Sequence, residues 1–490
     1  MILDDILYIL KNKSQNKAYT INKNSYTYSE FYKMVCNIYN YLLENYTNAK
    51  NIVVFGHKEI YMKATFLACS FAGKTYIPLD NAMPSERINL ILNAIKPDLV
   101  VGNIDNNYPT IEVNRLEKIM SNILVKEIDK IYLKEDDIYY IIFTSGSTGI
   151  PKGVKVTYSN LNSCINWLKN ITNVEKTVIL NQANFSFDLS VADLYLSLVT
   201  ESEQFIIESN KLDYKKMFEE LKDSKAELAI MTPSFAELLL IDKKFDKNLM
   251  NDLKQIIFCG EKLINSTVKE LFCRFPGLKI INCYGPTECT FAVTSVDIVD
   301  SDFNNDIPVG ISKPGVEIAI VDEDLKKLEE NEIGEILIIG DSVAAGYIND
   351  IKNKSFIKYN NTNAYLTGDF GYLKNGMLYY VARKDSQIKY KGYRIDLLDI
   401  EENLYKLEIF NRVEIVSLKD ANDMVTKIVA FVKLKNNIKK DIFEVKAMLK
   451  QKLPEYMCPV IKIVEEFPVN NNGKCDKKLL LEMMRDKNGE

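Results

Sequence analysis

The chain has 490 residues, of which 47% are hydrophobic and 26% charged. This composition is that of a globular protein and is too apolar for extended disorder. The length predicts about two or three domains. The net charge of −5 gives no electrostatic reason to expect nucleic-acid binding, so no nucleic-acid partner is expected.

The N-terminal stretch MILDDILYILKNKSQ is acidic where a secretion signal is basic, and it predicts the first helix of a domain. No stretch approaches the roughly 20 uninterrupted apolar residues of a membrane span, so we expect no membrane insertion. The nine cysteines are scattered and form no Cys-x-x-Cys pair, which indicates reduced thiols and a cytoplasmic location.

From residue 51 onwards, short β-branched runs alternate with longer amphipathic stretches. The first series is NIVVFG, KATFLACSFAG, TYIPLD, SERINLILNAI and DLVVG, and the second contains TVILNQ, QFIIES, ELAIMTPS, QIIFCGE and KIINCYGPTE. This alternation predicts an α/β fold with two βαβ-type sheets. Polar, turn-forming residues follow the strands, and ligands of such sheets bind at the carboxyl ends of strands.

The pattern changes after about Gly310 to short strands with few helices, which predicts a small β-rich subdomain. After Asp385 a compact α+β unit is expected, whose two long strands alternate and predict a sheet with one open face. We therefore predict an N-terminal part over residues 1–384 and a C-terminal domain over 385–490.

The single histidine, His57, is the only residue around which a Ser-His-Asp triad could be built. We favour its interpretation as a residue at a strand end.

A donor-rich loop stands between two apolar runs. It contains Thr144, Ser145, Gly146, Ser147, Thr148, Gly149, Pro151, Lys152 and Gly153. Glycines let backbone N–H groups converge on an anion, while hydroxyls and a lysine add donors and charge, so the loop suits a phosphate. The spacing is not that of a P-loop, because the loop continues into a strand instead of a helix. A plain surface turn is the alternative.

The loop TSGSTGIPKG resembles the phosphate-binding signature of the acyl-adenylate-forming (ANL) superfamily, which contains acyl-CoA synthetases, adenylation domains of non-ribosomal peptide synthetases and firefly luciferases. Four more stretches resemble its later motifs in the expected order: NCYGPTE (282–288), YLTGD (365–369), ARKDSQIKYKGYRID (382–396) and PVNNNGKCDKK (468–478). The resemblance covers essentially the whole chain and implies that the C-terminal domain is mobile.

The resemblance implies that a carboxylate attacks the α-phosphorus of ATP, which releases pyrophosphate and leaves an acyl-AMP; ATP and Mg²⁺ are the expected cofactors. In this reaction one anion attacks another, so the site must neutralise the negative charges and orient the carboxylate towards the α-phosphate. By resemblance, the loop from Thr144 to Lys152 holds the β- and γ-phosphates, and Glu288 with Thr287 holds Mg²⁺ and the α-phosphate. The remaining ATP-binding residues implied are Asn282, Tyr284 stacking on adenine, Gly285, Asp369 on the ribose hydroxyls, and Arg383.

The candidate catalytic residues are Lys474, Glu288 and Thr144. Lys474 lies in NNNGKCDKK, where its ammonium could bridge the substrate carboxylate and the α-phosphate. An ordinary turn lysine is the alternative. In the superfamily the C-terminal domain rotates about one hinge residue, which the resemblance places at Asp385.

The stretch NFSFDLSVADLY (184–195) resembles the amino-acid-activating branch, in which the aspartate at position 188 pairs with the substrate ammonium. A helix N-cap is the alternative for Asp188. More narrowly, this stretch with MTPSF (231–235) and FCGE (258–261) resembles the D-alanine:D-alanyl carrier protein ligases. That family implies D-alanine as substrate, a separate phosphopantetheine-bearing carrier protein as acceptor, and D-alanylation of teichoic acids. It also places Cys259, Phe291 and Ala292 beside the substrate side chain.

Cys259 could equally be a buried small apolar residue. The sequence departs from the pattern at Cys283, Ala382, Asp396 and Phe291. Phe291 stands where a smaller aliphatic residue is usual, so the pocket could favour glycine or another small amino acid.

A stand-alone adenylation enzyme of peptide biosynthesis therefore stays open. A CoA synthetase fits less well, because an apolar acid would leave Asp188 unpaired. A nucleotide-binding scaffold without activity is the remaining alternative.

Overall fold

The structure is a computed structural model that describes residues 1–490 except 13, 124–125, 145–150, 209–212, 300–306, 349–353, 384–386, 421–423, 436–437, 439, 469–478 and 481–490. The chain divides into two compact units. The first consists of Met1–Asn81, Leu92–Phe143 and Gly153–Lys384, and the second of Ala82–Ile91, Thr144–Lys152 and Asp385–Glu490. The boundary predicted between residues 384 and 385 lies outside the described residues and stays a prediction.

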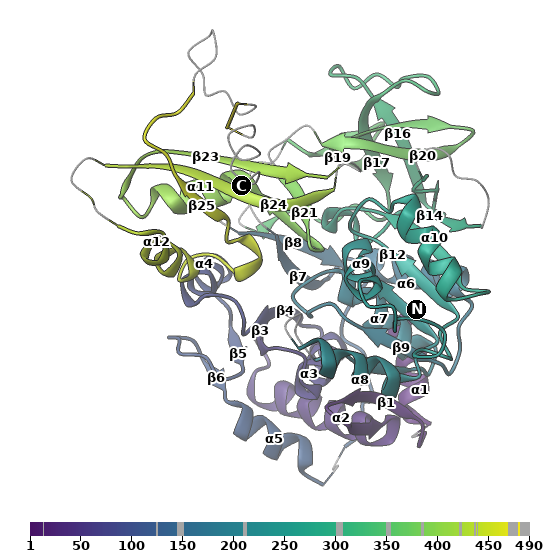
Figure 1. Ribbon diagram of the computed structural model, residues 1–490. Helices are drawn as coiled ribbons and strands as arrows, with labels where there is room; N and C mark the ends of the chain where they lie inside the picture. The colour runs from purple at the N-terminus through teal and green to yellow at the C-terminus, as the bar shows by residue number, and fades with distance from the viewer. Residues whose placement is uncertain are drawn as a thin grey trace. The chain divides into compact units, whose positions relative to one another are not determined.

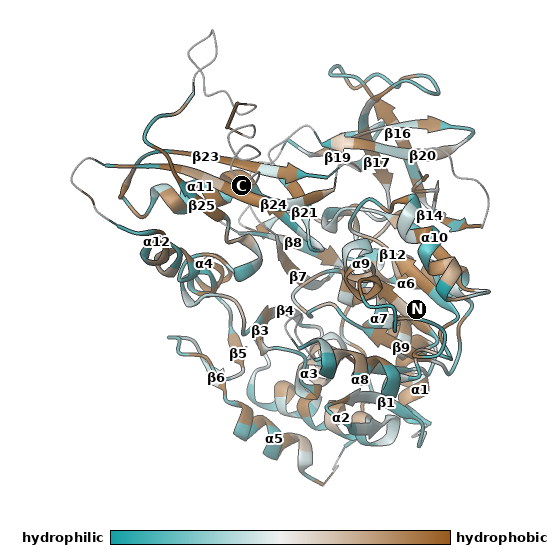
Figure 2. Ribbon diagram, viewed as in Figure 1, coloured by the Kyte–Doolittle hydropathy of each residue, from teal (hydrophilic) through white to brown (hydrophobic). Residues whose placement is uncertain are grey.

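A nine-stranded sheet in the order β15-β14-β13-β12-β11-β9-β10-β1-β2 is the largest of the first unit. Its middle strands, from β10 through β9, β11 and β12 to β13, run parallel. They are mostly buried and apolar, and β9 and β12 are brown in Figure 2. The strands are β1 (Lys17–Ile21), β2 (Asn24–Thr27), β9 (Val178–Asn181), β10 (Glu203–Ile206), β11 (Leu228–Met231), β12 (Gln255–Phe258), β13 (Lys279–Tyr284), β14 (Thr294–Ile298) and β15 (Ile311–Ser312).

The second large sheet has six strands in the order β6-β5-β3-β4-β7-β8, and its pairs β3–β4, β3–β5, β4–β7 and β5–β6 are parallel. Its strands are β3 (Asn51–Gly56), β4 (Thr75–Asp80), β5 (Leu99–Val101), β6 (Thr110–Ile111), β7 (Ile138–Thr144) and β8 (Lys152–Thr157). Helices α3 (Ile60–Phe71), α4 (Ser85–Ile95) and α5 (Val113–Ser121) connect its strands. The prediction of two βαβ-type sheets is confirmed.

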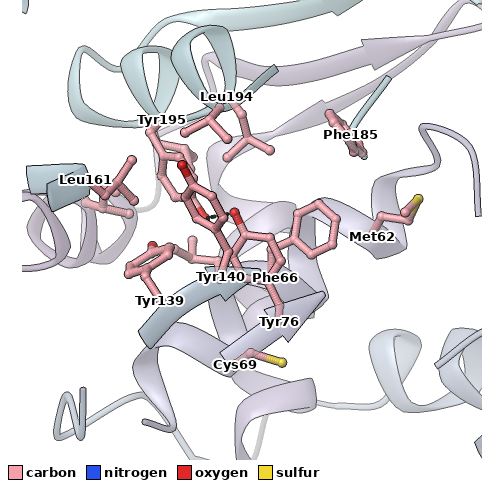
Figure 3. Packing of buried hydrophobic residues seen from close by; sticks show 14 of the residues in the cluster. Met62, Phe66, Cys69, Tyr76, Tyr139, Tyr140, Leu161, Phe185, Leu194 and Tyr195 are labelled. Carbon is pink, nitrogen blue, oxygen red and sulfur yellow. Dashed lines mark hydrogen bonds between the residues drawn. The ribbon is translucent and has the colours of Figure 1, made fainter. Parts of the chain in front are cut away.

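Helices α3 and α7 (Leu189–Val199) are buried along their whole length, which agrees with their mostly apolar sequences. Helix α7 packs on β9, β10 and β11, while its Tyr195 donates a hydrogen bond to the Tyr76 hydroxyl of β4 at 3.0 Å. The helix thus bridges the two sheets. Figure 3 shows Tyr195 above Tyr76, Tyr139, Tyr140 and Phe66, an aromatic cluster in the core between them.

The remaining helices of the first unit lie around these sheets (Figure 1). They are α1 (Ile2–Lys11), α2 (Tyr28–Asn45), α6 (Tyr158–Thr172), α8 (Tyr214–Ser224), α9 (Pro233–Leu240) and α10 (Asn265–Arg274). The predicted N-terminal helix is confirmed as α1. Local signals set several helix starts: Thr27 and Glu30 form a capping box on α2, and Thr232 caps α9, which has proline at its first position.

A five-stranded antiparallel sheet forms the β-rich part that the sequence predicts after Gly310. Its order is β16-β17-β19-β18, with β20 paired to β19. The strands are β16 (Val316–Val321), β17 (Gly334–Gly340), β18 (Phe356–Tyr359), β19 (Thr362–Lys374) and β20 (Met377–Arg383). Asp369 and Arg383 lie opposite each other on β19 and β20.

The second unit contains the α+β structure predicted after Asp385. Its elements are β21 (Gln387–Tyr390), β22 (Tyr393–Asp396), α11 (Leu397–Tyr405), β23 (Phe410–Lys419), β24 (Val425–Leu434), α12 (Ile442–Lys450) and β25 (Val460–Ile463). The prediction of one open sheet face is wrong. A second, smaller cluster is buried apart from the main core of this unit, so the face expected to be open is covered. It consists of Val416, Val429, Phe431 and Leu480.

His57 follows β3, as the interpretation of a strand-end residue predicts. Its Nδ1 lies 2.8 Å from Oδ2 of Asp80, which ends β4. The pair joins the carboxyl ends of two neighbouring strands.

Helices α3 and α7 each carry one charged residue that is fully buried. Burial lowers the pKa of Lys63 on α3 to about 7, against the opposing charge of Asp193 on α7. Burial raises the pKa of Asp193 to about 7, although Asn181 and Gln204 donate hydrogen bonds to it. The hydrogen bonds of the Lys63 ammonium are long, 3.4 Å to Ala18 O and to Ser197 Oγ, and the ammonium also lies over the rings of Tyr19 and Phe31 at 5.2 and 5.5 Å. These contacts compensate its desolvation in part, since its pKa is still lowered.

We predict that Lys63→Met stabilises the protein below neutral pH, because it removes a buried amine whose charged form is penalised by burial. A lowered pKa means that burial penalises the charged amine. The penalty is complete below a pH of about 7 and disappears as the pH rises towards the ordinary lysine value of 10.5. Thermal melting at about pH 6 and about pH 9 should therefore show the larger gain at the lower pH.

The exposed Lys118 of α5 provides the control, because Lys118→Met should leave the melting temperature nearly unchanged at both values. A lower melting temperature for Lys63→Met at about pH 6 would contradict this interpretation.

Candidate active site

Several predicted site residues fall outside the part of the chain that the structure describes. They are Ser145, Gly146, Ser147, Thr148, Gly149, Asp385 and Lys474. Thr144 and Lys152, at the two ends of the glycine loop, are described and belong to the second unit. The Thr144 hydroxyl donates to the Lys152 carbonyl at 3.5 Å, so the two ends of the loop lie next to each other.

Tyr284, Asp369 and Arg383, predicted to contact adenosine, form one buried group in the first unit. The Tyr284 hydroxyl donates to Asp369 Oδ2 and Arg383 Nη1 donates to Asp369 Oδ1, both at 2.7 Å. Arg383 Nη2 also donates to the Thr367 carbonyl at 3.1 Å. Burial, and then the Asp369 charge, raise the pKa of Tyr284, which keeps this phenol protonated as a donor. The sequence placed these three residues in different motifs, and the structure brings them together.

Asn282, also predicted to bind ATP, lies on β13 and is 2% exposed. Its Nδ2 donates to the Pro308 carbonyl at 2.8 Å, while its Oδ1 accepts no hydrogen bond from any residue that the structure describes.

Glu288, the predicted magnesium residue, is only 1% exposed. It lies in the short 3-10 helix Thr287–Cys289 that follows β13. The Tyr347 hydroxyl donates to its Oε1 at 2.6 Å, and its carbonyl accepts from the Ala344 N–H at 2.9 Å. Within the described residues no group of three or more His, Cys, Asp or Glu could hold a metal.

The turn after Glu288 has a strained backbone. Thr290 and Phe291 have φ values of +61° and +70°, a region that β-branched and bulky residues avoid. The Ala292 N–H closes the turn on the Thr290 carbonyl at 2.9 Å, and the Thr290 hydroxyl donates to the Ser342 carbonyl at 3.0 Å. The Cys259 thiol donates to the Phe291 carbonyl at 3.7 Å. Strain held by several contacts is typical of functional sites.

Asp188 stands at the N-cap position of α7 and is 8% exposed. Its backbone is helical and its side chain makes no capping hydrogen bond. Asp188 therefore has the position that the helix-cap alternative predicts but not the capping hydrogen bond, and its role as a substrate residue stays a prediction. The Asp188 charge acts on Cys164 of α6, whose pKa is raised to about 12 mainly by burial, with Lys313 opposing.

Cys259, Phe291 and Ala292 are buried in the same core cluster as Cys164 and Cys283. Burial, and then the neighbouring thiols of Cys259 and Cys164, raise the pKa of Cys283 well above its ordinary value. The Cys164 and Cys283 thiols are therefore neutral and act as small, polarisable surfaces. Cys259 is a buried small residue, as the alternative interpretation holds, and it also contacts the Phe291 carbonyl.

Sequence reasoning missed Tyr347, Ser342 and Cys164. The sequence pattern around each of these residues gives little indication of a role, because each reaches the site through contacts between segments that lie far apart in the chain. Tyr347 and Glu288, for example, are 59 residues apart.

Comparisons with known proteins identify the family. Residues 10–348 match the model of a family described as AMP-binding enzyme. A D-alanine–D-alanyl carrier protein ligase of Bacillus licheniformis is 38% identical over 453 residues, which are 90% of both chains. The enzyme of the same name from Lactococcus lactis is 32% identical over 99% of this chain and 100% of the relative.

Solved structures show the same fold. An adenylation domain from Vibrio cholerae, AlmE, bound to glycyl-adenosine-5'-phosphate, matches with a TM-score of 0.84 and 23% identity over 99% of this chain and 98% of the other. The amide bond synthetase McbA from Marinactinospora thermotolerans matches with a TM-score of 0.84 and 18% identity over 98% and 99%.

The chain therefore belongs to the AMP-binding enzyme family, on its branch of D-alanine–D-alanyl carrier protein ligases. The resemblance drawn from the motifs is confirmed, and so is the predicted fold class. Among the described residues we find no helix with both the length and the apolar character of a membrane span.

We predict that Gly285→Ala weakens AMP binding about tenfold, because overpacking costs about 1–3 kcal/mol. A Cβ at this position would lie 2.6 Å from Ala292 Cα and 2.9 Å from the Phe291 carbonyl oxygen, both backbone atoms of the strained turn. Calorimetric titration with AMP measures the effect.

Gly277→Ala is the control. It has φ of +80° but no atom within 4 Å of the added Cβ, so it introduces backbone strain without a clash near the site. Wild-type AMP affinity in Gly285→Ala would show that the turn does not shape the nucleotide site.

Proposed function

We propose that this enzyme activates D-alanine with ATP as D-alanyl-AMP and then transfers the D-alanyl group to the phosphopantetheine thiol of a separate carrier protein. The single observation that carries the proposal is the match to the D-alanine–D-alanyl carrier protein ligases over 90% or more of the chain. The site residues described above supply matching chemistry.

The proposed nucleotide site uses buried groups of the first unit. Asp369 has two acceptor oxygens, which suit the two ribose hydroxyls, and Arg383 and Tyr284 hold these oxygens in place. Tyr284 offers its ring to the adenine base. The glycine loop from Thr144 to Lys152 would hold the β- and γ-phosphates, on the strength of its donors in the sequence.

Mg²⁺ fits Glu288, because Mg²⁺ is usually held by one or two carboxylates together with substrate phosphates instead of by a cage of protein ligands. The buried carboxylate of Glu288 offers such a ligand without a cluster around it among the described residues. When bound, Mg²⁺ would neutralise phosphate charge. We expect Thr287, next to Glu288 in the chain, to contact the α-phosphate.

In the proposed first step, an oxygen of the D-alanine carboxylate forms a bond to the α-phosphorus while the bond to the bridging oxygen breaks and pyrophosphate leaves. Lys474, placed by its motif, would hold the carboxylate and the α-phosphate together. In the second step the carrier thiol attacks the carbonyl carbon of D-alanyl-AMP, and AMP leaves. Rotation about Asp385 between the steps is a prediction that rests on the resemblance.

The amino-acid pocket is proposed around Asp188, whose carboxylate would pair with the substrate ammonium. Asp188 is 8% exposed and stands at the start of the buried helix α7. Cys259, Phe291 and Ala292, all buried, would enclose the substrate side chain. Delivery of D-alanine to teichoic acid and a cytoplasmic location follow from the resemblance and the thiol pattern, and both stay predictions.

Glycine is the second candidate substrate. Two observations point to glycine: Phe291 is large where a smaller residue is usual, and the adenylation domain AlmE of matching fold was solved with a glycyl adenylate. A panel of amino acids separates the two candidates.

We predict D-alanine-dependent exchange of pyrophosphate into ATP in the presence of Mg²⁺. D-alanine should support exchange at least about tenfold better than L-alanine or glycine, because a misplaced methyl group costs about 1–3 kcal/mol in a packed pocket. Exchange with glycine alone would move the assignment to the second candidate, and no exchange with any small amino acid would refute the proposed activity.

We predict that Asp188→Asn raises the KM for D-alanine about thirtyfold or more and leaves ATP binding unchanged, because an unpaired buried ammonium costs about 2 kcal/mol or more. Asp193→Asn is the matched control. Asp193 is a second buried aspartate on α7, but Asn181 and Gln204 occupy its oxygens. An equal rise in KM for both variants would point to a general loss of structure in α7.

A further inference from the structure

We infer that Tyr347 is a positioning residue for the magnesium site: its hydroxyl fixes the carboxylate of Glu288, and its backbone ties that carboxylate to the strand that leaves the glycine loop. The inference rests on the proposed function for the role of Glu288. It concerns a residue that none of the five sequence motifs contains.

The side-chain contact is short and buried. The Tyr347 hydroxyl donates to Glu288 Oε1 at 2.6 Å, and the two residues are 6% and 1% exposed. A hydrogen bond to a buried carboxylate is stronger than one between neutral groups, and its geometry restricts the rotamer of the acid. The Tyr347 ring is held in turn by Phe356, with 5.2 Å between the ring centroids and an edge-on geometry.

The backbone on both sides of Tyr347 is fixed to β8. Tyr347 forms a bridge with Val154, the Lys155 N–H donates to the Gly346 carbonyl at 2.9 Å, and the Ala345 N–H donates to the Lys155 carbonyl at 2.8 Å. Val154 lies two residues after Lys152, at the start of the same strand. Gly346 has φ of +98°, a conformation that favours glycine and that sets the direction in which the chain enters Tyr347.

The same segment holds the main chain around Glu288. The Ala344 N–H donates to the Glu288 carbonyl at 2.9 Å, and the Ser342 carbonyl accepts from the Thr290 hydroxyl at 3.0 Å. Residues 342–347 therefore fix Glu288 at its carbonyl, at its carboxylate and at the turn that follows. A packing role alone would need the ring of Tyr347 and not its hydroxyl.

Groups that orient a metal ligand by hydrogen bonds affect metal affinity about 10- to 100-fold when they are removed. Tyr347→Phe keeps the ring and deletes the hydroxyl. We expect the variant to need at least about tenfold more Mg²⁺ for tight ATP binding. Its affinity for ATP without Mg²⁺ and its melting temperature should stay close to those of the wild type.

The experiment is calorimetric titration of the full-length enzyme with ATP across a series of Mg²⁺ concentrations, without any amino acid. Tyr61→Phe is the matched control, because Tyr61 is also 6% exposed and donates one hydrogen bond, to the Phe55 carbonyl at 2.8 Å. An unchanged Mg²⁺ dependence in Tyr347→Phe overturns the inference. A loss of ATP affinity that is equal with and without Mg²⁺ also overturns it, since that result indicates a structural effect.

A double-mutant cycle with Glu288→Gln keeps the inference testable if Tyr347→Phe is destabilised. In the Glu288→Gln background, Tyr347→Phe should cause no further change in Mg²⁺ dependence, because the carboxylate that it positions is absent. Additive effects would contradict the inference. This readout does not depend on the amino acid, so it can succeed or fail independently of D-alanine-dependent exchange.

Discussion

The site of the first unit depends on one constraint: a carboxylate taken out of water must receive hydrogen bonds from groups that are held in place. Glu288 and Asp369 are each 1% exposed, and each accepts from a tyrosine hydroxyl. Tyr284 and Arg383 satisfy Asp369, and Tyr347 donates to Glu288. In the proposed site, the substrate phosphate and ribose would meet charges whose positions were set during folding, which would lower the cost of reorganisation at the moment of reaction.

The fold provides these positions through buried elements. Strand β13 carries Tyr284 at its carboxyl end, where ligands of parallel sheets bind, and the antiparallel pair of β19 and β20 places Asp369 opposite Arg383. Helix α7 holds Asp188 at its start and lies in the core between the two large sheets. The fold carries two further energetic costs: backbone strain at Thr290 and Phe291, and the desolvation of Lys63.

Local patterns in the sequence predicted much of this arrangement. The periodicity of hydrophobic residues and the turn-forming residues predicted the two βαβ-type sheets and the β-rich part, and the motif NCYGPTE indicated Tyr284 and Glu288. The partners of these residues were beyond local reasoning, because Tyr347 meets Glu288 across 59 residues. The open face predicted for β24 was wrong, since Leu480 covers Val429 and Phe431 from a distant part of the chain. The sequence could not tell whether the Asp188 side chain caps α7, because that depends on its backbone angles and on the position of its carboxylate.

Formation of the acyl-adenylate in a single turnover tests the central claim most directly. With enzyme in excess over ATP labelled at the α-phosphate, D-alanine and Mg²⁺ should convert the label to D-alanyl-AMP with one equivalent of pyrophosphate, and L-alanine should give far less product. Release of ADP and phosphate, or formation of AMP without any amino acid, would contradict the account.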